Sequence, residues 1–127
     1  NAWPGLECFC CKMMYSRGFQ VQAFVEALLQ NLVLVAPTGS GKTLVAVMLL
    51  ARMRQLNPLR LAVMVVDRIP LVYQQGCVVE RQTRMRVCFL CSESKTQKVL
   101  SLLKDNHYDV LVSTAGSLLE LLHSGGF

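Results

Sequence analysis

One stretch of the chain decides the fold, and it reads Leu32-Val33-Leu34-Val35-Ala36-Pro37-Thr38-Gly39-Ser40-Gly41-Lys42-Thr43. The apolar run over Leu32–Ala36 predicts a buried strand, and the Pro- and Gly-rich residues after it predict a tight turn. Lys42–Gln55 then predicts a helix, which Asn57-Pro58 closes. A strand, a turn and a helix in this order are typical of an α/β unit.

The turn has the residue types that a phosphate group needs. Gly39 and Gly41 allow the backbone to fold tightly, so that its N–H groups point inward around phosphate oxygens. The helix that follows adds the positive end of its dipole. Lys42 supplies a full charge to the β- and γ-phosphates, and the Thr43 hydroxyl reaches Mg²⁺. The alternative is a Gly-rich turn that merely precedes a helix. We therefore predict a nucleoside triphosphate site formed by Pro37, Thr38, Gly39, Ser40, Gly41, Lys42 and Thr43.

Strand and helix continue to alternate along the chain. Apolar runs predict further strands over Leu61–Val66, Arg86–Leu90 and Tyr108–Ser113. Apolar spacing and helix-start residues predict helices over Val21–Leu29, Leu71–Arg81, Ser94–Lys104 and Ser117–Leu122. Four uninterrupted apolar strands that alternate with helices predict an α/β fold, a parallel sheet with helices on both faces. Ligands of such sheets bind beyond the carboxyl ends of the strands.

Length and composition allow one domain at most. The chain has 127 residues, of which 53% are hydrophobic and 17% charged, and this composition excludes a disordered protein. Thirteen Lys and Arg against eight Asp and Glu leave a charge of +5, which is compatible with a polyanionic partner. The longest apolar runs, Leu44–Ala51 and Leu61–Val66, are far shorter than the ~18 residues that span a bilayer. Since no secretory leader opens the chain, we expect an intracellular piece of a longer protein, cytoplasmic or nuclear, without a membrane partner.

Six cysteines form two C-x-x-C spacings, which can indicate zinc. The first pair is Cys8/Cys11 and the second is Cys88/Cys91. Cys88 lies in an expected strand, where residues three apart point to opposite faces, so the second pair could chelate a metal only if the chain turned there. The favoured interpretation is therefore that the cysteines are free and mostly buried thiols.

Three segments outside the turn narrow the function. They read Arg17-Gly18-Phe19-Gln20, Val65-Val66-Asp67-Arg68-Ile69-Pro70-Leu71-Val72-Tyr73-Gln74-Gln75 and Tyr108-Asp109-Val110-Leu111-Val112-Ser113-Thr114-Ala115-Gly116-Ser117-Leu118-Leu119. Together they resemble the first motor domain of superfamily 2 helicases, closest to the Dicer-like and viral-RNA-sensor branch. That branch has Arg-x-Tyr-Gln before the phosphate loop and a Pro-Leu-Val-x-Gln-Gln segment. Residues 114–117 are similar to the Thr-Pro-Gly-Arg of DEAD-box enzymes but lack its Pro and Arg.

The resemblance implies a fold, cofactors and site residues. It implies a partial RecA-like P-loop domain over 17–127, with ATP and Mg²⁺ as cofactors. Residues 1–16, whose Cys- and Met-rich composition fits no clear element, are expected to be an irregular segment. Lys42 and Thr43 would be the catalytic residues, and Thr43 would hold the metal. Gln20 would read the adenine edge, since an amide has one donor and one acceptor to match N6 and N7. Arg17 and Phe19 would hold the base or stack on it.

The resemblance also implies a nucleic-acid partner, double-stranded RNA in this branch. Arg68 would grip the phosphate backbone, and Pro70 would set the helix start beside it. Thr114 and Gly116 would approach another phosphate with a hydroxyl and a backbone N–H. The alternatives are an exposed surface arginine and a plain strand-to-helix turn. A second motor domain in the parent protein is the other implied partner.

Two basic groups and the missing acidic segment complete the expectations. The first group is Arg81, Arg84 and Arg86, and the second is Arg52, Arg54 and Arg60; both are predicted to be solvated rather than bound to nucleic acid.

Hydrolysis in this family needs an Asp-Glu-x-His/Asp segment, which the sequence lacks and which the resemblance places soon after residue 127. We therefore expect this chain alone to bind ATP weakly at best and to turn it over negligibly.

Three functions remain open at this point. The favoured one is the ATP-binding part of an ATP-dependent RNA helicase or translocase, Dicer-like in kind. The second is a truncated, non-catalytic module that binds nucleotide or RNA, or a fragment of a DEAD-box-type RNA helicase. The third is an unrelated P-loop ATPase or kinase, against which Arg17–Gln20 and Pro70–Gln75 argue.

Overall fold

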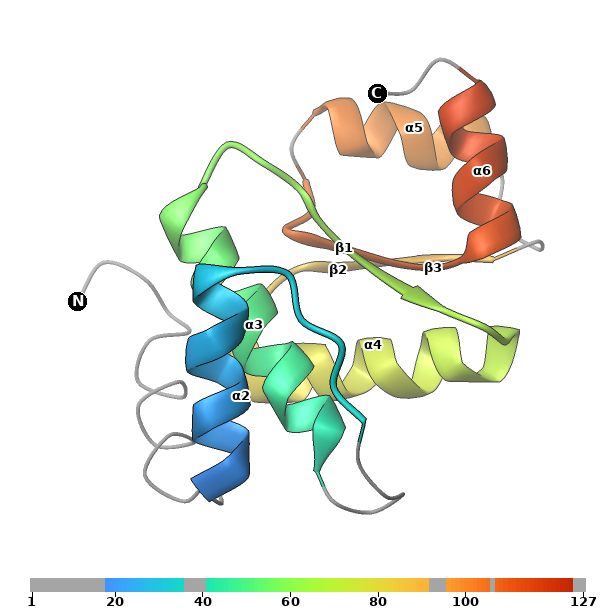
Figure 1. Cartoon of the computed structure of the whole chain (residues 1–127). Helices are drawn as coiled ribbons and strands as arrows, with labels where there is room; N and C mark the ends of the chain where they lie inside the picture. Colours follow the sequence, from blue (N-terminus) through green and yellow to red (C-terminus); the bar gives the residue numbers. More distant parts are fainter. Residues whose placement is uncertain (1–17, 36–40, 92–95, 106, 125–127) are drawn as a thin grey trace.

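The sheet consists of three short apolar strands that pair in parallel. The computed structural model describes residues 18–35, 41–91, 96–105 and 107–124. Within them the strands are β1 (Ala62–Val66), β2 (Val87–Leu90) and β3 (Val110–Thr114), and β3 lies between the other two. Val66 is opposite Thr114, and Val87 is opposite Val110. All three carboxyl ends therefore meet at one edge of the sheet (Figure 1).

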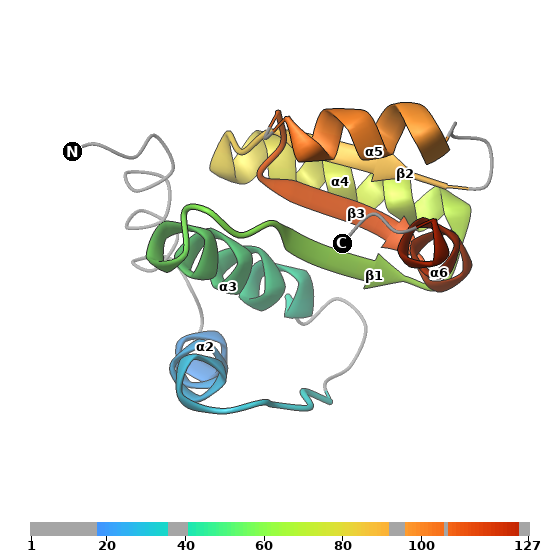
Figure 2. The same ribbon diagram turned by 90° about the horizontal axis from the view of Figure 1, so that it is seen from above.

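Helices cover both faces of this sheet, as predicted. The described helices are α2 (Gly18–Leu29), α3 (Lys42–Leu56), α4 (Ile69–Thr83), α5 (Thr96–Lys104) and α6 (Ala115–His123). Figure 1 shows α3 and α4 on one side of the sheet and α5 and α6 on the other. α2 packs on α3 on the side away from the sheet (Figure 2). None of the described helices has the length and apolar character that crossing a bilayer requires.

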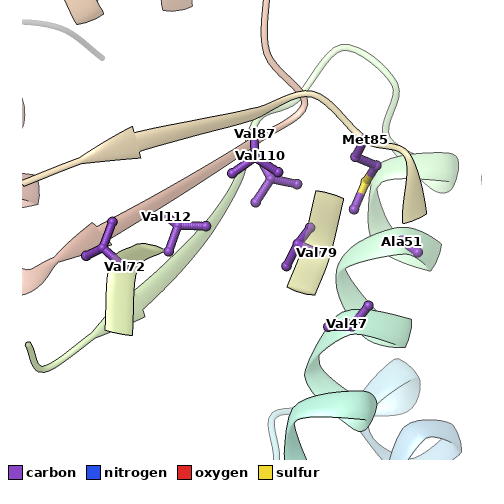
Figure 3. Packing of buried hydrophobic residues seen from close by; sticks show 8 residues of the cluster. All are labelled: Val47, Ala51, Val72, Val79, Met85, Val87, Val110 and Val112. Atoms are coloured by element: carbon purple, nitrogen blue, oxygen red, sulfur yellow. The ribbon is translucent and has the colours of Figure 1, made fainter. Parts of the chain in front are cut away.

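Alternating side chains of the central strand fill two cores. Val110 and Val112 point toward α3 and α4, whereas Leu111 between them points toward α5 and α6, because successive strand residues face opposite sides. The first core is valine-rich, and Figure 3 shows its members Val47, Ala51, Val72, Val79, Met85, Val87, Val110 and Val112. The second core joins Cys88, Leu90, Leu100, Leu111 and Leu121. Both faces of β3 are thus buried, as its uninterrupted apolar sequence predicts.

A glycine on α4 allows this helix to approach β2 closely. A Cβ at Gly76 would overlap the ring of Phe89. That ring is stacked on Tyr73, with centroids 5.8 Å apart, so it has little freedom to move aside. The close approach of α4 to the sheet therefore depends on the missing side chain at Gly76.

The predicted strand over Leu32–Ala36 is wrong for its described part. Residues 31–35 are extended but belong to no strand, and Val33 and Val35 are 88% and 89% exposed. The segment runs past α2 and α3, apart from the sheet (Figure 2). An apolar stretch becomes a strand only where a neighbouring strand bonds its backbone, and none of the described strands lies beside this segment. Only Leu34 packs, against the α2–α3 core. The other predicted elements form, with ends within three residues of expectation.

A buried ion-pair cluster joins the three strands at their amino ends. The carboxylate of Asp109, just before β3, accepts hydrogen bonds from Nε and Nη2 of Arg54 at 3.2 and 2.9 Å. It also accepts bonds from Nε and Nη2 of Arg86, before β2, at 3.3 and 3.2 Å and from the Arg86 backbone N–H at 2.9 Å. The Asp109 carbonyl accepts a bond from Ala62 at the start of β1. One residue thus connects α3, β1 and β2 to β3.

The prediction that both arginine groups are solvated is wrong for Arg54 and Arg86, which belong to this ion-pair cluster. Arg54 is 7% exposed, and its Nη1 donates to the carbonyls of Pro58 and Arg60. The Arg86 side chain is 54% exposed but still bonds to Asp109, and this bond raises its pKa. Sequence spacing could not indicate this, since Asp109 lies 55 residues after Arg54.

The second C-x-x-C pair behaves as its strand position predicts. Cys88 is buried in the core under α5 and α6, whereas Cys91 Sγ lies 3.4 Å from the Tyr73 hydroxyl of α4, on the other side of the sheet. Burial raises the pKa of Cys88 to about 11, so this thiol stays protonated at neutral pH. Among the described residues, no group of three His, Cys, Asp or Glu could hold a metal ion. Cys8, Cys10 and Cys11 lie outside these residues.

Asp109→Asn should lower the free energy of unfolding by about 3 kcal/mol, because Arg54 would remain buried without its counter-charge. Burial opposes ionisation of Asp109, but the bonds from Arg86 and Arg54 outweigh it and lower the pKa. The stabilisation is therefore full above the ordinary carboxyl pKa of about 3.9 and disappears as pH falls through the lowered value. Urea unfolding between neutral pH and pH ~3 measures both effects. Asp105→Asn, an exposed control, should change little; equal losses in the two variants would contradict the assignment.

Gly76→Ala should destabilise the chain by about 1–3 kcal/mol, since the new methyl group displaces the stacked Phe89 ring. Gly116→Ala is the matched control on α6, because a Cβ there meets no atom. Alanine also has the higher helix propensity, so this control should be neutral or slightly stabilised. Urea denaturation of both variants measures the difference, and an unchanged midpoint for Gly76→Ala would show that α4 is not held this closely.

Candidate functional site

The described part of the phosphate turn is its last residue and the helix that follows. Gly41 has φ 92° and ψ 26°, a left-handed conformation that favours glycine. α3 begins directly after it at Lys42, whose side chain is exposed, while Thr43 is half-buried. The N–H groups of the first turn and the Lys42 charge thus lie where the turn meets the helix. Pro37, Thr38, Gly39 and Ser40 lie outside the described residues, and their roles stay predictions.

Gln20 joins α2 to this turn. Its Nε2 donates to the Gly41 carbonyl at 3.0 Å, and the residue is only 5% exposed. A Cβ on Gly41 would collide with this amide, so position 41 must be glycine for a second reason. An ordinary surface amide is therefore the wrong interpretation of Gln20. Phe19, beside it, is 37% exposed, and Arg17 lies outside the described residues. Base recognition by Arg17, Phe19 and Gln20 remains a prediction.

An open cavity of about 510 Å³ lies between α2, the segment after it and α3. Lys42 is its one charged lining residue, and Ala27, Leu32, Leu34, Val45, Ala46 and Leu49 supply its apolar walls. Gln20 and Gly41 do not line it. Triphosphates need N–H donors and cations, and the Gly41–Lys42 junction offers both, whereas the walls of this cavity are mostly apolar.

The four predicted nucleic-acid residues come together at the carboxyl edge of the sheet. Arg68 follows β1, and Thr114 ends β3, and these strands are paired with Val66 opposite Thr114. Arg68 is the N-cap residue of α4, and Pro70 lies in the first turn of that helix. The Arg68 side chain is 79% exposed and has only a long contact with Asp67, Nε to Oδ2 at 3.8 Å. Its guanidinium is therefore available to a ligand.

Thr114 has a structural role at this edge. It is the N-cap residue of α6: its Oγ1 accepts a bond from the Ser117 N–H at 3.4 Å and donates to Ser117 Oγ at 3.0 Å. Ser117 is buried, and sequence reasoning missed its part, although a Thr three residues before a Ser is a usual cap pattern. Gly116 is exposed, with open space where a side chain would be. The edge therefore leaves room for a ligand beside the first turn of α6.

Sequence comparison places the chain in a helicase family and finds similar Dicer-like proteins. The family described as "DEAD/DEAH box helicase" matches residues 17–126. "Dicer-like protein 1" of Aspergillus niger is 34% identical over 117 residues, 84% of this chain and 8% of that protein. "Endoribonuclease Dicer homolog 1" of Arabidopsis thaliana is 32% identical over 114 residues, 84% of this chain and 6% of that protein. The chain thus spans less than a tenth of the length of these relatives.

Solved structures agree on the fold. A hypothetical ATP-dependent RNA helicase from Sulfolobus tokodaii superposes with a TM-score of 0.71 at 21% identity, over 95% of this chain and 37% of that one. The yeast DEAD-box splicing factor Prp28 gives a TM-score of 0.61 at 23% identity, over 73% of this chain and 25% of that one. The predicted RecA-like fold is confirmed, as a part of the complete domain. Family match, relatives and fold agree: the chain belongs to the DEAD/DEAH box helicases and is similar to the helicase segment of Dicer-like proteins.

Proposed function

We propose that this chain is the ATP-binding part of an ATP-dependent RNA helicase or translocase that processes double-stranded RNA in a Dicer-like parent protein. The observation that carries the proposal is the junction of turn and helix: a left-handed Gly41, the start of α3 at Lys42 and the Gln20 amide bonded to the Gly41 carbonyl. The Dicer-like relatives supply the double-stranded RNA part of the proposal.

The residues at this junction fit ATP and Mg²⁺. The Lys42 ammonium is exposed and lies at a helix N-terminus, where an anion is favoured. The Thr43 hydroxyl, in the same turn, would be the protein ligand of Mg²⁺, which neutralises phosphate charge when bound. Pro37–Ser40 would complete the loop around the phosphates. Gln20, with Arg17 and Phe19, would face the base.

The carboxyl edge of the sheet would hold the RNA backbone. Arg68 would pair with a phosphate, and Gly116 would let a second phosphate approach the backbone N–H groups at the start of α6. Thr114 would act there by holding this helix start in place. Such contacts position an RNA strand without reading its bases. A second motor domain of the parent would close over the nucleotide, in the cytoplasm or the nucleus.

Hydrolysis needs groups that this chain does not supply. The sequence contains no adjacent Asp-Glu pair to hold the metal and orient the attacking water. We therefore expect the chain alone to bind ATP without appreciable turnover.

Lys42→Ala should weaken binding of a fluorescent ATP analogue at least about tenfold, because it removes the main positive charge at the phosphates. Fluorescence titration in the presence of Mg²⁺ measures the affinity. Lys98→Ala, an exposed lysine on α5, is the matched control and should bind as the wild type does. Unchanged affinity in the Lys42 variant would show that the phosphates bind elsewhere.

Arg68→Ala should weaken binding of an RNA duplex of about 20 base pairs and lower the salt dependence by about one phosphate contact. Fluorescence anisotropy over a range of KCl concentrations gives both the affinity and the slope. Lys104→Ala serves as the control, since Lys104 is exposed in the last turn of α5, at the opposite edge of the sheet. An unaltered slope for the Arg68 variant would remove this residue from the RNA site.

A further inference from the structure

The basic residues of the chain gather at the amino edge of the sheet, opposite the candidate site. They are Arg52 and Arg54 in the last two turns of α3, Arg81 and Lys104 in the last turns of α4 and α5, and Arg60, Arg84 and Arg86 in the connections to β1 and β2. The acids in these places and in the connection to β3 are only Glu80, Asp105 and Asp109. In the rest of the described chain, charges balance: Lys42, Arg68 and Lys98 match Glu26, Asp67 and Glu120. The positive charge of the described residues thus belongs to this edge.

Contacts within the fold use only some of these basic side chains. Arg54 and Arg86 pair with Asp109. Arg81 and Lys104 lie in the last turns of α4 and α5, where helix dipoles favour cations. Arg52 donates from Nη1 to Gln55 Oε1 at 2.8 Å. Arg60 and Arg84 remain, because both are exposed and neither guanidinium has an ion-pair or hydrogen-bond partner within the described ranges.

Exposed apolar side chains lie beside Arg60 at this edge. Leu59 is 92% exposed, and Leu56 and Met53 on α3 are 53% and 42% exposed. A small open cavity of about 160 Å³ lies here, lined by Met53, Arg54, Asn57, Arg60, Leu61 and Ala62. Arg54 holds the backbone around it, because its Nη1 donates to the carbonyls of Pro58 and Arg60. The arrangement is an exposed apolar group beside Arg60, with Arg84 exposed at the same edge of the sheet.

We propose that this amino edge, formed by Met53, Leu56, Leu59, Arg60 and Arg84, is a docking surface for an acidic peptide segment of a protein partner. Protein interfaces combine an apolar centre with a polar rim and are enriched in Arg and Met. An arginine fork also binds carboxylates bidentately. Nucleic acid would use the arginines but not the exposed leucines, since phosphate contacts supply its affinity. The partner segment therefore carries Asp or Glu residues around one or two apolar side chains.

A synthetic peptide tests the proposal on the 127-residue chain. The probe is a fluorescein-labelled peptide in which Glu and Leu alternate, and fluorescence anisotropy at low salt measures its binding. Arg60→Glu and Arg84→Glu should each weaken binding at least about fivefold by charge reversal. Lys98→Glu, the same reversal on α5, should not. Leu59→Ser should weaken binding about tenfold, whereas Leu119→Ser on α6, where the leucine is 54% exposed, should cost nothing measurable.

Three outcomes would overturn this assignment. The peptide does not bind; or it binds with equal losses in the Lys98→Glu and Leu119→Ser controls; or Arg60→Glu and Arg84→Glu weaken binding of an RNA duplex but not of the peptide. The last result would make the edge a nucleic-acid surface instead. Circular dichroism melting of each variant separates lost binding from lost folding. None of these results depends on the ATP site, because no residue of that site is changed.

Discussion

The pairing of Asp109 with Arg54 and Arg86 is the interaction on which the arrangement of the sheet depends. A buried carboxylate is costly unless each oxygen is bonded and a counter-charge is near. Here Oδ1 receives Arg54 and Arg86 side-chain donors, and Oδ2 receives the Arg86 backbone and Nε. The same residue bonds the starts of β1 and β2 through its backbone. The alignment of three strands and the end of α3 therefore depend on one charge.

The carboxyl edge of the sheet carries the candidate nucleic-acid residues. α4 and α6 start at the ends of β1 and β3, so Arg68 and Gly116 lie at neighbouring strand ends. The nucleotide-binding junction is positioned differently, by the packing of α2 on α3 through Phe24 and Met48 and by the Gln20 bond to Gly41. The two halves of the candidate site thus depend on separate cores. A substitution in the α2–α3 core should affect nucleotide binding before it affects RNA binding.

The predicted helices and strands formed where the local sequence pattern and the tertiary environment agreed. β3 begins with three apolar residues and is buried on both faces, and α4 begins next to Pro70 as its sequence indicates. Leu32–Val35 has an equally apolar pattern but remains unpaired, because a strand requires a neighbour as well as a composition. The prediction for Arg54 was wrong in the opposite direction. Its charge predicted that the side chain is exposed to solvent, but the distant carboxylate of Asp109 makes its burial possible.

The sequence by itself determined the α/β order, the phosphate turn, the helicase resemblance and the residues that follow each strand. These features are local, since turns, helix starts and strand runs are specified by residues close together in the chain. Only the tertiary structure decided that Gln20 is buried against Gly41 and that Asp109 joins both arginine groups. Such contacts join residues distant in sequence, and their energies depend on burial, which exists only after the chain has folded.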